Sequence, residues 1–153
     1  MVRKRTHACA SIVATVFSAA AIAATLNASV AQADPPSDFK TPSGNIYCQM
    51  QPNGDGVAAV MCEGGGPEAG PEPDCAEHMQ WGDRLSITQG QAPESHCHTD
   101  TIRSNEAQAP VLVYGQTKSI GTITCDSETT GLTCTDASTG HYFTMSREAN
   151  TLG

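Results

Sequence analysis

The feature that most constrains the fold is a pair of cysteines in two short alternating stretches near the C-terminal end. The run Gly-Thr-Ile-Thr-Cys ends at Cys125, and the run Gly-Leu-Thr-Cys ends at Cys134. In each run an apolar residue stands two positions before the cysteine, so in a strand the two share a face. Residues 126–131 between the runs are turn formers and end in glycine. We therefore predict a β-hairpin closed by a disulfide between Cys125 and Cys134, because facing residues of two antiparallel strands lie at a suitable Cα separation.

The first 33 residues have the three parts of a secretory signal peptide. Basic residues occupy positions 3–5, an alanine-rich apolar run follows at 12–26, and Ala-Gln-Ala at 31–33 is a cleavage signal. We expect cleavage before Asp34 and a secreted, extracellular domain of residues 34–153. The apolar run is shorter than the ~20 residues of a membrane span, and Cys9 precedes it. Neither a membrane anchor nor a lipid anchor is therefore expected.

The six cysteines that remain after cleavage predict a disulfide framework, since their number is even and the domain is small and secreted. Residues 44–48 repeat the pattern Gly-x-Ile-x-Cys of 121–125, and Val-Met-Cys, ending at Cys62, resembles Leu-Thr-Cys. This second hairpin predicts a bridge between Cys48 and Cys62, which leaves Cys75 and Cys97 for the third. Six cysteines allow about 15 connectivities in principle.

The charge balance of the mature part excludes two classes of partner. It holds five basic residues against all 16 acidic ones, which is a net charge of −11. A nucleic-acid or anionic-lipid surface needs clustered Lys and Arg, and the sequence has no such cluster after residue 33.

The rest of the mature chain also has β character. Alternating or apolar stretches at 85–87, 111–115 and 140–147 predict further strands, residues 34–43 predict an extended lead-in, and the only helical signal is one turn near 146–149. The fold class predicted is mainly β: a small disulfide-linked sandwich or barrel of about six to eight short antiparallel strands.

Residues 63–77 are rich in Glu, Gly, Pro and Asp and predict a mobile acidic loop attached at Cys75. Carboxylates in this loop raise the question of a calcium site, but the regular ligand spacing of a calcium loop is absent. No metal or cofactor is therefore predicted. The carboxylates considered are Glu68, Glu72, Asp74 and Glu77.

Several segments occur in a recognisable order: 41–48, Cys97-x-x-Asp100-Thr101, Tyr114-Gly115, 131–134, 140–143 and Ser146-Arg147. In this order they resemble a family of small secreted actinobacterial, mainly mycobacterial, proteins of uncharacterised function. That family has an SPSGNI-x-C opening and a GVTC…GHGF-x-x-SR ending. The chain departs from the pattern at Thr41, where the family has Ser, and at Tyr142, where it has Gly. The resemblance implies the compartment and the fold, and it brings no activity.

Three residues of types that bind zinc alternate along the chain at His96, His98 and Asp100. In a strand they would share one face. The spacing matches no known zinc motif, the intervening Cys97 is expected in a disulfide, and the two histidines lie outside the family pattern. Solvated histidines are the simpler interpretation.

Two functional hypotheses remain. The first is a monomeric, non-enzymatic domain that binds an unidentified partner at or beyond the cell envelope, with His141, Tyr142, Asp100 and Arg147 as candidate binding residues. The alternative is a small secreted hydrolase that uses His141 with a carboxylate such as Asp100 and a serine such as Ser146. No Gly-x-Ser-x-Gly motif supports the alternative, so no catalytic residue is assigned. For His141 we favour a structural role, in which its side chain forms a buried hydrogen bond.

Overall fold

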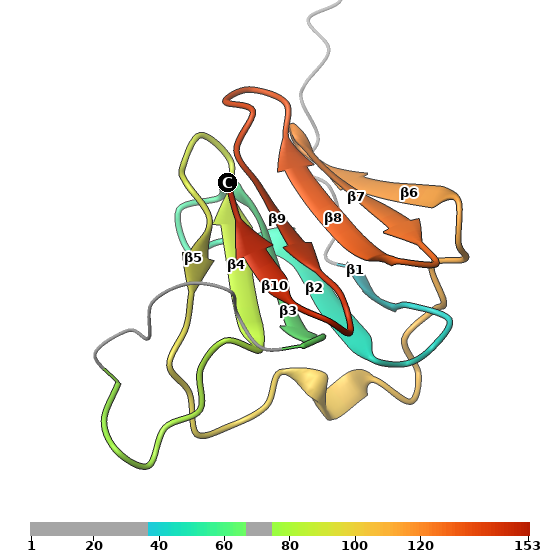
Figure 1. Ribbon diagram of the computed structural model, residues 1–153. Helices are drawn as coiled ribbons and strands as arrows, with labels where there is room; N and C mark the ends of the chain where they lie inside the picture. Colours follow the sequence, from blue (N-terminus) through green and yellow to red (C-terminus); the bar gives the residue numbers. More distant parts are fainter. Residues whose placement is uncertain (1–36, 67–74) are drawn as a thin grey trace, which may run out of the picture. The chain divides into compact units, whose positions relative to one another are not determined.

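Two antiparallel five-stranded sheets make up the fold, and each is built from consecutive strands (Figure 1). The computed structural model describes residues 37–66 and 75–153, which fall in one compact unit. The first sheet contains β1 (Ser37–Lys40), β2 (Ile46–Pro52), β3 (Ala58–Gly64), β4 (Arg84–Thr88) and β5 (Glu94–Ser95). The second contains β6 (Gln116–Ile120), β7 (Ile123–Glu128), β8 (Gly131–Asp136), β9 (Tyr142–Met145) and β10 (Asn150–Leu152).

The predicted mainly-β class is confirmed, although the described residues form ten strands instead of six to eight. Within the described residues the regular helix is a single 3-10 turn, Arg103–Asn105. No helix in this part of the chain is long and apolar enough to cross a membrane. The predicted signal peptide and the candidate calcium ligands Glu68, Glu72 and Asp74 lie outside the described residues.

All three predicted disulfides are present. Cys48 of β2 faces Cys62 of β3, and Cys125 of β7 faces Cys134 of β8. Their Cα atoms are 4.1 and 3.9 Å apart, which is the close spacing of a pair that does not share backbone hydrogen bonds. Each of these bridges therefore joins the second and third strands of its sheet, as the repeated hairpin pattern predicted. The third bridge, Cys75–Cys97, lies outside the sheets.

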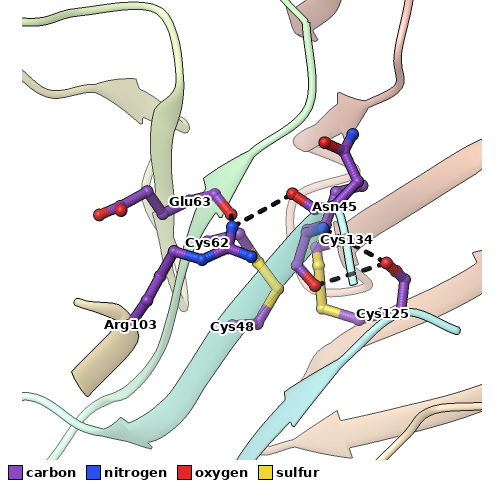
Figure 2. The surroundings of a disulfide bond; sticks show 9 residues. Asn45, Cys48, Cys62, Glu63, Arg103, Cys125 and Cys134 are labelled. Carbon is purple, nitrogen blue, oxygen red and sulfur yellow. Dashed lines mark hydrogen bonds between the residues drawn. A yellow bond between two sulfur atoms is a disulfide. The ribbon is translucent and has the colours of Figure 1, made fainter. Parts of the chain in front are cut away.

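The inner faces of the two sheets enclose one core, and the two hairpin disulfides belong to it (Figure 2). Strand alternation explains the composition, because every second residue points inward. Burial of these apolar side chains is the main stabilising contribution to the fold. The cluster comprises Phe39, Ile46, Cys48, Met50, Val60, Cys62, Leu85, Ile87, Leu112, Ile120, Ile123, Cys125, Leu132, Cys134, Phe143 and Met145.

The outer face of the first sheet is covered by the connection to the second sheet and carries a buried ion pair. Arg84 donates to Glu63 at 2.8 Å, and both side chains are 8% exposed. The hydroxyl of Thr101 and the backbone N–H of Ile102 also donate to Glu63. Burial opposes ionisation of Glu63, but these donors lower the pKa of its carboxyl below its usual value. The connection is thereby fixed to the sheet.

Two predicted segments differ from the structure. The acidic loop was expected to begin at residue 63, but β3 continues through Gly64, and Glu63 is buried because Arg84 and the connection cover it. The predicted strand at 111–115 is wrong. This segment crosses between the sheets, where only Leu112 reaches the core, and Val113 is 51% exposed.

Candidate functional site

A cleft of about 330 Å³ opens where three turns meet, and we call it the end cleft. One wall comes from residues 41–46, between β1 and β2. A second comes from 128–131, between β7 and β8, together with Tyr114. The third comes from 146–148, between β9 and β10. Both sheets therefore contribute to the site.

Hydrogen bonds within the turn itself fix the first wall. The hydroxyl of Thr41 accepts from the backbone N–H of Ile46 at 3.3 Å, and that of Ser43 accepts from the N–H of Asn45 at 3.2 Å. Gly44 adopts a positive φ of 70°, a conformation that side-chain-bearing residues rarely take. This explains why the sequence Thr-Pro-Ser-Gly-Asn makes a tight turn here.

Arg103 supports the same turn, and Figure 2 shows its guanidinium bonded to Asn45 and Glu63. Its guanidinium donates to the carbonyl oxygens of Gly44 at 2.6 Å and Asn45 at 3.2 Å, and to that of Glu63 at 3.1 Å. Glu106 pairs with the same guanidinium. Arg103 thus links the first wall to the end of β3 and positions the turn without lining the cleft.

The hydroxyl of Ser146 organises the third wall. It accepts from the backbone N–H groups of Glu148 and Ala149 and donates to the carbonyl oxygen of Ala149 at 2.8 Å. The N–H of Gly66 donates to the carbonyl of Ser146 at 2.5 Å. A Cβ at Gly66 would lie 2.6 Å from the carbonyl oxygen of Arg147, so glycine permits this close approach. The expected helical turn at 146–149 is instead this hydroxyl-bonded turn.

The second wall is held against its neighbours in two places. A Cβ at Gly131 would lie 2.3 Å from the carbonyl oxygen of Met145, so β8 begins in direct contact with β9. The segment that carries Tyr114 is fixed to β7, because Gly115 donates to the carbonyl of Ser127 at 2.7 Å and the hydroxyl of Ser127 donates to the carbonyl of Leu112.

Charged groups of both signs lie at the end cleft. Glu128, Arg147 and Glu148 are all exposed there. Among the described residues, the guanidinium of Arg147 has no hydrogen bond or ion pair, whereas those of Arg84 and Arg103 are both paired with carboxylates. Arg147 therefore presents its full set of donors to a ligand.

The four predicted binding residues lie in three places. Arg147 lines the cleft. His141 and Tyr142 are at the opposite end of β9, a strand about 10 Å long. Asp100 lies by the outer face of the first sheet, where Arg84 donates to it at 2.9 Å and lowers the pKa of its carboxyl. The structure does not bring His141 to Asp100.

His96 and His98, which the sequence suggested as zinc ligands, each have their own hydrogen-bond partners. His98 is buried, and its ring nitrogens lie 2.9 Å from Oδ1 of Asp83 and 2.7 Å from the carbonyl oxygen of Asp100. Nε2 of His96 lies 2.6 Å from the hydroxyl of Ser86, and burial lowers the pKa of His96. The described residues contain no group of three side chains placed to hold a metal ion.

Comparison with known protein families shows to which family the chain belongs. The sequence pattern of one family matches residues 18–152. The chain belongs to DUF6636, a family of unknown function. All ten strands and all three turns of the end cleft lie within the DUF6636 match. Searches of the curated proteins and of the solved structures found no match.

Sequence reasoning named two of the residues at the cleft of this DUF6636 domain, Arg147 as a binding residue and Ser146 as the serine of the hydrolase alternative. It missed Asn45, Tyr114, Glu128 and Glu148. One signal was available: eight of the twelve lining residues belong to the segments 41–46, Tyr114, Gly131 and 146–147 that carry the family resemblance. Their distance in sequence concealed that they share one site.

Proposed function

We propose that this DUF6636 domain is a secreted, non-enzymatic binding domain whose ligand occupies the end cleft. The observation that supports the proposal best is the guanidinium of Arg147, which has no partner among the described residues and lies on one of the three turns that line the cleft. Binding residues commonly lie on loops that a rigid scaffold positions. Here two sheets with their own disulfides form the scaffold.

Secretion is supported by the leader sequence and by cysteine chemistry. Residues 3–33 have the charge, apolar run and Ala-x-Ala end of a signal peptide. Disulfides form and persist in oxidising compartments, and all six cysteines of the mature part are paired. Such a protein would meet its ligand at or beyond the cell envelope.

The hydrolase alternative finds little support in the geometry. The carboxylate of Asp100 is bonded to Arg84, and His141 lies elsewhere. The bonded pair Ser86 and His96 lies on the outer face of the first sheet, away from the cleft, and within the described part of the chain no carboxylate is hydrogen-bonded to His96. A Ser–His–carboxylate arrangement requires such a partner to orient the imidazole. Labelling of Ser86 by a fluorophosphonate probe would revive this alternative.

The binding proposal is tested by NMR on the oxidised protein with four classes of probe. These are a neutral oligosaccharide (cellotetraose), a dicarboxylate (succinate), a diamine (putrescine) and a short peptide (tetraalanine). At least one is expected to shift the amide signals of Asn45, Thr130 and Glu148 saturably. Arg147→Ala should abolish the shifts. Lys118→Ala, which removes a cation from β6, should retain them.

The contrary results are equally clear. Saturable shifts confined to His141 and Tyr142 would place the site at the other end of β9. No saturable shift at the cleft with any of the four classes would overturn the proposal.

A further inference from the structure

We infer that the end cleft is a saccharide site, with Glu128 and Glu148 accepting from sugar hydroxyls, Arg147 donating to them, and Tyr114 contacting the sugar ring. The inference rests on the proposed function and assigns the chemical class of its ligand. It depends on three observations: the mixture of donors and acceptors, an exposed aromatic ring and a pre-formed cleft.

The hydrogen-bonding groups at the cleft favour a ligand rich in hydroxyls. Ionised Glu128 and Glu148 only accept hydrogen bonds, and Arg147 only donates them. An anion would pair with Arg147 but would be repelled by two carboxylates. A cation would pair with the carboxylates but would be repelled by Arg147. A sugar hydroxyl both donates and accepts, so neighbouring hydroxyls of one ring satisfy both kinds of group without adding charge.

Tyr114 supplies the apolar contact that a sugar ring needs. Its side chain is 38% exposed and lines the cleft. The preceding segment is anchored through buried Leu112 and through the bond from Gly115 to Ser127. An aromatic ring offers a flat apolar face with a polar tip, which suits the C–H face of a pyranose with its hydroxyls at the rim.

The cleft is formed before any ligand arrives. Arg103 holds the first wall, Gly131 fixes the second against Met145, and Ser146 closes the third. Binding therefore requires little ordering of the chain, which lowers its entropic cost. A volume of about 330 Å³ is at the small end of the range for small-molecule sites. We expect the cleft to hold the end of a saccharide chain.

Calorimetric titration of the oxidised protein tests the inference with cellotetraose, maltotetraose, mannotetraose and chitotetraose. At least one should bind saturably. Tyr114→Ala and Glu128→Gln should each weaken binding tenfold or more. The matched controls are Tyr142→Ala, which removes a similarly exposed ring (40%) at the opposite end of β9, and Glu77→Gln, which removes an exposed carboxylate elsewhere. Both controls should bind as the wild type does, and equal melting temperatures should confirm that every variant is folded.

The outcomes separate the inference from the proposed function. If succinate, putrescine or tetraalanine binds at the cleft and none of the four sugars does, the saccharide inference is wrong and the binding function stands. If sugars bind, and Tyr142→Ala weakens their binding while Tyr114→Ala does not, the saccharide site is not at the end cleft. If no probe of any class binds, both are wrong.

Discussion

The carboxylate of Asp136 in the second sheet accepts a 2.6 Å hydrogen bond from the backbone N–H of Gly90, in the β4–β5 turn of the first sheet. Thr122 and Ser138 donate to the same carboxylate, which is completely buried. Burial alone would raise the pKa of Asp136, but these donors hold it far below its usual value. One ionised side chain thus connects the two sheets.

The ionisation of Asp136 predicts a specific dependence of stability on pH. Because its pKa is depressed in the folded state, its contribution is fully present above the unfolded value of about 4 and is lost as the pH falls further. Asp136→Asn should lower the free energy of unfolding by about 2–4 kcal/mol at pH 7. At pH 3 the difference in the free energy of unfolding between this variant and the wild type should be smaller. Urea unfolding at both pH values measures this, with exposed Asp55→Asn as the control; a difference that did not change with pH would contradict the prediction.

Asn150 should tolerate almost no substitution. Its buried amide nitrogen lies within 3.2 Å of three carbonyl oxygens, those of Gly64, Gly66 and Gly82, and so joins β10 to the first sheet. Asn150→Asp keeps the shape but presents a carboxylate to these oxygens. We expect a loss of more than about 3 kcal/mol in the free energy of unfolding. Denaturant titration tests this against Gln116→Glu, an exposed amide-to-acid change, and a loss below about 1 kcal/mol would refute it.

The three disulfides should differ in their access to reductant. Cys48–Cys62 and Cys125–Cys134 are completely buried, whereas Cys75 and Cys97 are half-buried outside the sheets. Thiol–disulfide exchange needs an approach to sulfur. Limited dithiothreitol at neutral pH should therefore reduce Cys75–Cys97 first. Alkylation and peptide mass spectrometry would then find the label on these two cysteines, and equal labelling of all six would contradict the prediction.

We expect the side chain of His141 to contribute little to stability. The structural role expected from the sequence required a buried hydrogen bond, but the bonds of His141 to Thr139 and Asp136 use only its backbone. Its ring has no hydrogen bond to the described residues and is only half-buried. His141→Ala should thus cost less than about 1 kcal/mol in a thermal melt. A larger loss would show that the ring has a structural partner.

Local patterns in the sequence predicted the hairpins and their disulfides. Ile-x-Cys repeats place their residues on one face, and the six cysteines that follow Cys9 pair as neighbours along the chain. The period of two in a strand carries this information directly. The buried state of Glu63 was not predictable in this way, because it depends on Arg84 and Thr101, which are distant in sequence.

The end cleft shows the same limit. Arg147 was identified as a single residue, but its neighbours Asn45 and Glu128 reach it only through the packing of two sheets. The periodicity of a single strand therefore does not reveal that these residues share a site. The prediction for 111–115 failed because this segment forms only one isolated bridge to β1, between Val111 and Lys40, before a turn leads into β6.

The consecutive pairing of the cysteines has a consequence for how the chain acquires its covalent structure. A polypeptide that emerges N-terminus first from a ribosome or a translocation channel presents Cys48 and Cys62 before Cys75, and it completes each pair before the next one begins. Oxidation in order of emergence thus yields the native bridges directly. Disulfide isomerisation, which takes minutes to hours when uncatalysed, is not needed on this route, and the protein can mature in a compartment that supplies only an oxidant.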